Sequence, residues 1–277
     1  ANHGVTASNV DNVELRNNRI ENSGGSGVSF DNVGGNIVLF DNVINNSADR
    51  GIQVQNSLTE SPVEVAIAGF DLNNNQVGME FLATASATEF PSQRVVIGPS
   101  TAANTSVGTP GGTALSNSIL GSREEGIVAE ATGPTTTLIS SASQELSISD
   151  ATVDGSGGAG IQVMALNGAH RLEFTLTGST VANNGGNGFE AVNGENPGGP
   201  TRTAAVQEIV VRDSTIANNG GNGIDVSLAD ASAQELVIRG NQITGNTGDG
   251  IRSRAGNVGV QDWSTRAENG AAGIREN

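Results

Sequence analysis

The chain has 277 residues, a formal net charge of −16, no cysteine, and 13 basic residues that are all arginine. The acidity argues against binding to nucleic acid or to anionic membranes, because both need basic patches, and the absence of cysteine excludes disulfides and thiolate metal sites. No apolar run approaches the roughly 18 residues of a membrane span, so we expect no membrane insertion in this segment.

Aromatic residues make up only 3% of the chain, with no tyrosine and a single tryptophan, Trp263. The core must therefore be built from small and branched aliphatic side chains. The 39 glycines and the many asparagines suit a chain that turns often and adopts left-handed backbone conformations.

A pair made of glycine and an apolar residue recurs along the chain. Its copies are Gly4-Val5, Gly27-Val28, Gly51-Ile52, Gly78-Met79, Gly126-Ile127, Gly160-Ile161, Gly188-Phe189, Gly223-Ile224, Gly250-Ile251 and Gly273-Ile274. The shortest spacing is 23 residues, as from Gly4 to Gly27, and most others resemble this unit plus an insertion. In most copies a lone aliphatic residue precedes the glycine by seven positions, although Leu72 and Leu120 precede it by six.

A third apolar marker, such as Val210-Val211, lies earlier in each repeat. Short β-branched blocks bounded by Asn and Gly predict three brief strands per repeat. Such strands cannot bury a face within one repeat, but stacked coils let each strand pair with its copy roughly 4.8 Å away. We therefore predict an all-β, three-sheet solenoid of about 9–10 coils of about 23 residues, with residues 1–277 as one domain.

The apolar member of each pair should form an interior column that runs from Val28 to Ile274. The turn after the middle strand carries Asn22, Asn46, Asn74, Asn183 and Asn218, which we interpret as a structural ladder of left-handed turn residues. Each of their side-chain amides can bond to the amide one coil away. Residues 99–114 leave two alternatives open, an extra degenerate coil or one coil with a long excursion, and the extra coil is favoured.

The repeat resembles the right-handed parallel β-helix repeats of the pectate-lyase-like superfamily and of large bacterial surface proteins such as adhesins. This resemblance covers nearly the whole chain and implies a right-handed, single-stranded parallel β-helix, in agreement with the handedness rule for parallel crossovers. The insertions fall between the third strand of one coil and the first strand of the next, at Asn56–Pro62, Leu82–Gln93, Glu130–Ser143 and Asn193–Val206. They should emerge along one edge, where a glycan could bind.

The best candidate for chemistry is the outward column that follows the glycine pairs. It contains Ser29, Gln53, Glu80, Val128, Gln162, Glu190, Asp225, Arg252 and Arg275. Glu190 and Asp225 should lie on adjacent coils, where two carboxylates can share a proton or hold calcium. The resemblance implies that, in an enzyme, Glu190, Asp225 and Arg252 would be catalytic and the two acids would be the metal ligands. The favoured interpretation is a surface charge ladder in which Arg252 offsets Asp225.

Other features argue against an enzyme. No tyrosine is present to form a sugar platform, and the outward residues of the first strands, such as Val210 and Val237, are mostly uncharged, which suggests a covered surface. Both ends stop at the same phase of the repeat without a recognisable cap, so we expect a segment of a longer solenoid or a unit that stacks end to end.

We therefore expect a non-enzymatic structural or adhesive segment of a large extracellular or cell-surface bacterial protein. It would need no cofactor, and it would form homo-oligomers by lateral or end-to-end association. The alternatives are a polysaccharide lyase or epimerase that uses the acidic pair with calcium, and a glycan-binding solenoid.

Overall fold

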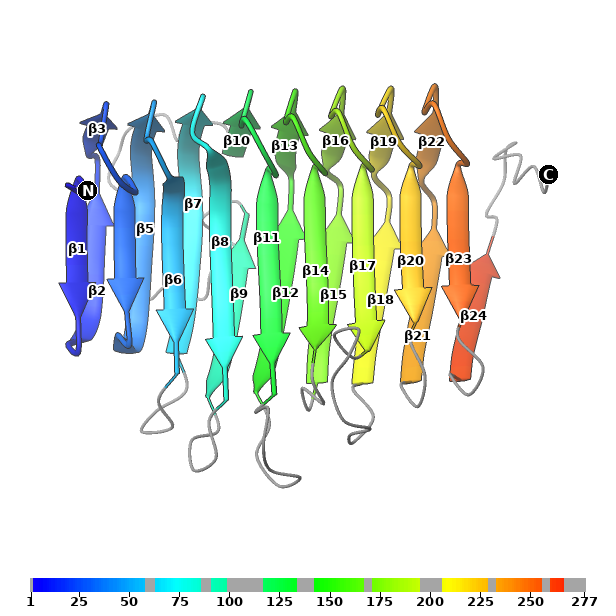
Figure 1. Ribbon diagram of the computed structural model, residues 1–277, viewed down its shortest axis with the longest axis horizontal. Coiled ribbons are helices and arrows are strands. Elements are labelled where there is room, and N and C mark those ends of the chain that lie inside the picture. The colour runs from blue at the N-terminus through cyan, green and yellow to red at the C-terminus, as the bar shows by residue number, and fades with distance from the viewer. Residues whose placement is uncertain are drawn as a thin grey trace.

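The computed structural model describes residues 2–57, 63–85, 91–98, 117–133, 142–166, 171–194, 206–228, 233–255 and 260–266. Their regular structure consists of strands that pair in parallel and wind into an elongated prism, with β1 at one end and β23 and β24 at the other (Figure 1). In these ranges we find no helix with the length and apolarity to cross a membrane.

The strands form three ladders, which we name by the order of their strands within a coil. The first ladder contains β2 (Asp11–Arg16), the first part of β5 (Gly34–Asn45), the first part of β7 (Val63–Asn73), β9 (Ser92–Ile97), β12 (Ser143–Ser149), β15 (Arg171–Thr177), β18 (Val206–Arg212), β21 (Ala233–Arg239) and β24 (Val260–Arg266). The second ladder contains β3 (Arg19–Glu21), the second parts of β5 and β7, β10 (Asn117–Leu120), β13 (Ala151–Asp154), β16 (Thr180–Ala182), β19 (Thr215–Ala217) and β22 (Gln242–Thr244). The third ladder contains β1 (Val5–Ser8), β4 (Val28–Asp31), β6 (Arg50–Asn56), β8 (Val77–Thr84), β11 (Ile127–Thr132), β14 (Ile161–Leu166), β17 (Phe189–Gly194), β20 (Ile224–Leu228) and β23 (Ile251–Ala255).

The three predicted faces are therefore present, although hydrogen bonding joins two of them. The third ladder is a separate nine-stranded sheet, whereas the first and second ladders form one 15-stranded network. The link exists because β5 and β7 continue through the corner between the two faces, where Asp41 and Gly69 adopt φ of 51° and 61°. In later coils the corner interrupts the strand, as between β15 and β16.

The predicted interior column is confirmed in its described part. Its backbone register runs without a break through Val28, Ile52, Met79, Ile127, Ile161, Phe189, Ile224 and Ile251. The members from Val28 to Ile224 are at most 1% exposed, so like side chains stack on like along the core. Ile274 lies outside the described residues.

The pairing of the central strands contradicts the expectation of an extra coil. Ile127 of β11 pairs directly with Met79 of β8, and Ile119 of β10 pairs with Leu72 of β7, which leaves no place for an intervening rung. Residues 99–116 themselves lie outside the described residues. The pairing thus supports one coil with a long insertion between its first and second strands.

The same register corrects the middle marker of that coil. Ile119, seven positions before Gly126, points inward and is 1% exposed, whereas Leu120 is 37% exposed. A one-residue change of register moves a side chain to the opposite face of a strand. Since Ile119 and Leu120 are both aliphatic, either of them could be the residue of the middle strand that points into the core. The structure selects the one that keeps the common spacing.

The predicted insertions come between β6 and β7, β8 and β9, β11 and β12, and β17 and β18. At each of these places the chain passes from a strand of the third ladder to the next strand of the first ladder. This placement agrees with insertion at one edge, with the 99–116 segment as the exception. The inserted residues 58–62, 86–90, 134–141 and 195–205 lie outside the described ranges.

The asparagine turns are left-handed as predicted, but the amide ladder lies one residue later. Asn22, Asn46, Asn74, Asn183 and Asn218 have φ between 53° and 57°. The following residues Asn184 and Asn219 are buried, and Asn184 Nδ2 donates to Asn219 Oδ1 at 2.9 Å. Asn219 Nδ2 continues the chain to the half-buried Asn246, whose Oδ1 accepts at 2.9 Å, so side-chain amides link three successive coils.

Candidate functional site

The outward column that sequence analysis singled out forms one continuous row on the third ladder. The backbone pairs Ser29 with Gln53, Gln53 with Glu80, Glu80 with Val128, Val128 with Gln162, Gln162 with Glu190, Glu190 with Asp225, and Asp225 with Arg252. The predicted adjacency of Glu190 and Asp225 is therefore confirmed. Arg275 lies outside the described residues.

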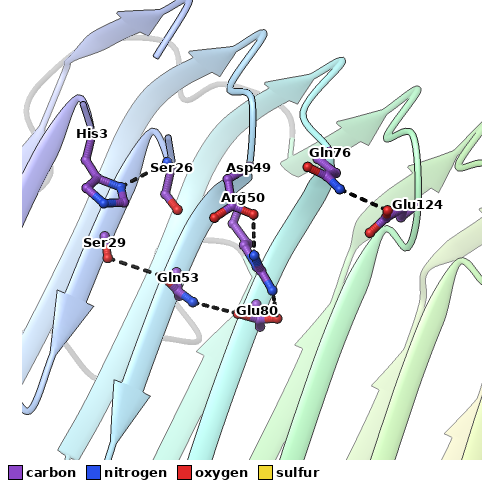
Figure 2. A network of polar contacts seen from close by, with 9 residues as sticks. All are labelled: His3, Ser26, Ser29, Asp49, Arg50, Gln53, Gln76, Glu80 and Glu124. Carbon is purple, nitrogen blue, oxygen red and sulfur yellow. Dashed lines mark hydrogen bonds and ion pairs between the residues drawn. The ribbon is translucent and has the colours of Figure 1, made fainter. Parts of the chain in front are cut away.

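Glu80 is the centre of a polar network at the N-terminal end of this column (Figure 2). Its carboxylate is nearly buried, at 7% exposure, and accepts hydrogen bonds from Arg50 Nη2 and Gln53 Nε2, both at 2.8 Å. Ser29 Oγ in turn donates to Gln53 Oε1 at 3.2 Å. Three successive coils thus share one hydrogen-bonded chain that ends on a neutralised acid.

Arg50 bridges Glu80 and the turn that precedes β6, where it also pairs with Asp49 (Figure 2). Burial alone would lower the Arg50 pKa, but the hydrogen bond and charge of Glu80, followed by those of Asp49, raise that pKa above its ordinary value. The guanidinium is therefore charged at neutral pH, beside the carboxylate of Glu80.

Two further contacts in Figure 2 connect turns of neighbouring coils in the same region. Gln76 Nε2 donates to Glu124 Oε1 at 2.9 Å, and His3 Nδ1 accepts the backbone N–H of Ser26 at 3.0 Å. Each contact joins one coil to the next. They therefore stabilise the stacking of neighbouring coils.

At the C-terminal end of the column the two predicted acids have different surroundings. Glu190 is half-buried and accepts a hydrogen bond from Gln162 Nε2 at 3.3 Å. Asp225 is only 5% exposed and accepts a bond from Asn222 Nδ2 at 2.9 Å. Both acids are thus held by side chains of their own column or of the adjoining turn.

The partner of Asp225 differs from the one that we expected. Arg252 is paired with Asp225 in the backbone register, but the ion pair comes from Arg254, whose Nη2 lies 3.3 Å from both carboxylate oxygens. Among the described residues Arg252 is exposed and makes no ion pair with Asp225. Arg254 is the next outward residue after Arg252 on the same strand. The alternation of side chains along a strand therefore predicts that Arg254 points outward, but it does not predict that its side chain extends to Asp225.

The two acids do not fit a calcium site as they stand. Calcium needs six to eight oxygen ligands, whereas no group of three or more acidic, histidine or cysteine side chains capable of holding a metal occurs in the described ranges. Asp225 is also committed to Arg254 and Asn222, and a cation would have to displace that guanidinium. The roles assigned to Glu190, Asp225 and Arg252 in catalysis, and to the acids in calcium binding, stay predictions.

A second polar surface was missed by sequence analysis. The outward positions on the first ladder that flank Val210 and Val237 are charged, with Glu208 and Glu235 on one side and Arg212 and Arg239 on the other. The signal was present in the repeated Gln-Glu dipeptides at 144–145, 207–208 and 234–235. The central outward position of β18 and of β21 is uncharged, and the charges lie two residues before it and two residues after it.

The comparisons with known proteins agree with this architecture. The family described as "Right handed beta helix region" matches residues 3–201, and the same three-ladder register continues beyond residue 201 as far as β23. No curated protein matches the chain significantly. Since the family match covers more than half of the chain and agrees with the parallel ladders, the chain belongs to the right-handed β-helix family.

Proposed function

We propose that the chain is a non-catalytic structural or adhesive segment of a large extracellular or cell-surface protein. The observation that carries the proposal is that the two most buried acids of the third-ladder column already have hydrogen-bond and ion-pair partners within the chain. Glu80 is held by Arg50 and Gln53, and Asp225 by Arg254 and Asn222. A catalytic acid or base must instead be within hydrogen-bonding reach of a substrate proton.

The same contacts support a mechanical role. The contacts Ser29–Gln53, Gln53–Glu80 and Arg50–Glu80 each join one coil to its neighbour, which resists sliding or separation of the coils. The core adds to this resistance, because aliphatic residues stack along the axis with almost no exposure. A solenoid whose coils are joined by these hydrogen bonds and by a stacked core is suited to act as a rigid spacer.

The extracellular location is part of the proposal. Net acidity and the absence of cysteine are compatible with it, and the repeat resembles those of large surface proteins. Antibodies against the chain should label the surface of intact source cells or their secreted fibres. Labelling that requires permeabilised cells would overturn this part.

The competing enzymatic function is tested by direct assay. Uronic-acid polymers should not be cleaved by the purified chain above background, with or without added calcium, as followed by absorbance of unsaturated products. Cleavage by the wild type that is lost in the Glu190→Gln and Asp225→Asn variants would overturn the structural proposal. As a matched control, Glu14→Gln changes an exposed acid on the first ladder, remote from the third-ladder column.

The insertion edge, on which a glycan-binding function would depend, lies outside the described residues. No contact in the described part of the chain favours that function over the structural one.

A further inference from the structure

The outward face of the first ladder carries charges in separate rows near the C-terminal coils. We call three adjacent rows of outward residues on β12, β15, β18 and β21 the charged face. Its acid row is Glu145, Glu173, Glu208 and Glu235, which pair in register on successive coils. Its middle row is Ser147, Thr175, Val210 and Val237, and its third row is Ser149, Thr177, Arg212 and Arg239. A fourth outward row lies beside the acid row and outside this face, and it consists of Ser143, Arg171, Val206 and Ala233.

The acid row is only partly neutralised within the chain. Arg94 contacts Glu145 at 3.1 Å, and Arg171 lies 2.5 Å from Glu173 and 2.7 Å from Glu208. Glu235 is exposed and makes no ion pair within the described part of the chain. Carboxylates on adjacent strands lie roughly 4.8 Å apart and repel one another, so this row benefits from additional positive charge.

The arginines at the other side of the face are in the converse situation. Arg212 and Arg239 pair side by side, and Arg212 Nε donates to the hydroxyl of Thr177 at 3.0 Å. Neither arginine makes an ion pair among the described residues. Each lies four residues along the strand from the glutamate of its own coil, a separation of roughly 13 Å that prevents direct pairing.

We infer that the charged face binds the same face of a second copy of this chain, with the two solenoids side by side and running in the same direction. A two-fold axis along the valine row exchanges the acid row and the arginine row. Each glutamate row then faces the arginine row of the other copy, and Val210 and Val237 face their own counterparts. If the copies ran in opposite directions, each row would face its own charge, which is unfavourable.

The backbone register extends this arrangement by one coil. In β24, Asp262 pairs with Glu235, Ser264 with Val237 and Arg266 with Arg239, which repeats the sequence of acidic, small and basic residue types. On β12 and β15 the third row consists of hydroxyl residues, Ser149 and Thr177, which can donate hydrogen bonds to opposing carboxylates. Complementarity therefore covers the four strands β12, β15, β18 and β21.

The expected interface is small. Four strands of seven residues cover a patch of roughly 20 Å by 20 Å, so two copies would bury about 800 Å² in total, which is below the range of stable specific interfaces and typical of weak, transient ones. We therefore expect a weak dimer that dissociates as salt is raised from 20 mM to 500 mM. The inference deepens the proposed structural function by naming its lateral partner, whereas the proposed function does not require this contact.

Charge exchange gives a stringent test by sedimentation equilibrium of the complete 277-residue chain. In the Arg212→Glu/Arg239→Glu variant the face becomes acidic, and in the Glu208→Arg/Glu235→Arg variant it becomes largely basic. Each variant alone should dimerise at least about tenfold more weakly than the wild type, because like charges now meet. An equimolar mixture of the two should restore association, since an acidic face then meets a basic one.

A matched control separates the location of the charge from the net charge. Arg19→Glu/Arg123→Glu produces the same change in net charge as Arg212→Glu/Arg239→Glu, but away from the charged face, and should leave dimerisation within about twofold. Circular dichroism of each variant should match the wild type. A monomeric wild type at low salt and high concentration, or a mixture that associates no better than its components, would overturn the inference while leaving the uronide assay of the proposed function unaffected.

The direction of the copies is tested by oxidation of single cysteines, since the chain has none of its own. Val237→Cys lies on the two-fold axis and should form a disulfide-linked dimer readily at low salt and slowly at high salt. Gln242→Cys, exposed on the second ladder of the same coil, should cross-link slowly at both salt concentrations. Equal rates for the two variants at low salt would contradict the parallel arrangement.

Discussion

The glycines of the repeated pairs from Gly4 to Gly223 are required because no space is left for a side chain, and not for their backbone freedom. At Gly188, a Cβ atom would lie 2.5 Å from Ile216 Cγ2 and 2.7 Å from the carbonyl oxygen of Gly223 on the next coil. Its φ is not in the left-handed region, so conformation alone would tolerate other residues. The coils approach so closely at this point that the repeat spacing itself depends on the missing side chain.

Gly188→Ala should therefore destabilise the protein. The added methyl group must push apart two coils or displace Ile216, and we expect a loss of about 1–3 kcal/mol in the free energy of unfolding. Urea denaturation followed by circular dichroism measures this loss. Gly24→Ala is the control, because its nearest contact would be at 3.7 Å, and it should change the free energy of unfolding by less than about 0.5 kcal/mol. Equal effects of the two substitutions would refute the spatial explanation.

The sequence predicts which residues point into the core more reliably than it predicts which side chains pair with each other on the surface. The strict period of two and the fixed offset from glycine identify the interior column, because a residue that breaks either would leave the core. Pairing on the surface depends on the length and rotamer of each side chain. Arg254 reaches Asp225 although Arg252 is its backbone neighbour, and no spacing in the sequence distinguishes these two possibilities.

The turns between the second and third ladders depend on two consecutive residues with different functions. Asn218 is exposed and supplies the left-handed conformation, whereas Asn219 is buried and supplies hydrogen bonds. Asn219 Oδ1 accepts both the backbone N–H of Asn184, at 3.1 Å, and its side-chain amide, at 2.9 Å. Sequence analysis identified the first function at the correct positions but assigned the inter-coil amide ladder to the same residues.

Replacing the two asparagines should separate these functions. Asn219→Ala leaves the buried N–H groups of Asn184 without their acceptor, and we expect a loss of about 2–4 kcal/mol in the free energy of unfolding. Asn218→Gly keeps the left-handed turn and should change it by less than about 0.5 kcal/mol. Thermal and urea unfolding of both variants measure the difference. A loss in Asn218→Gly as large as the loss in Asn219→Ala would contradict this division, because glycine keeps the left-handed turn and removes only the side chain.

At the scale of whole strands, the sequence predicted the three ladders and the insertion edge, but not the continuous corner of β5 and β7. The corner residue is Asp41 in β5 and Gly69 in β7, both with positive φ, as is Asp213 between β18 and β19. The same residue types at the same conformation therefore occur in both kinds of corner. What differs is whether the residues on either side pair with the next coil, and this depends on the neighbouring strand and not on the local sequence.

For the whole molecule, stacking makes each coil depend on its neighbours. β11 pairs with both β8 and β14, and it is buried along most of its length. β1 pairs only with β4 in the described part of the chain, and its residues alternate between half-buried and exposed. In a solenoid, local stability is the sum of the intrinsic stability of a coil and its interfaces, so a coil with one interface should open more often.

Amide hydrogen exchange of this chain should therefore follow a gradient along the axis. Amides of β1 should exchange at least about 1,000-fold faster than those of β11, which corresponds to a difference of about 4 kcal/mol in opening free energy. Protection should rise progressively through β4 and β6, because each has two neighbouring strands but lies closer to the end that frays. Mass spectrometry of peptides that cover residues 2–57 and 117–133 resolves the order. Uniform protection of β1 and β11 would show that the coils open as one cooperative unit, and it would contradict the predicted gradient.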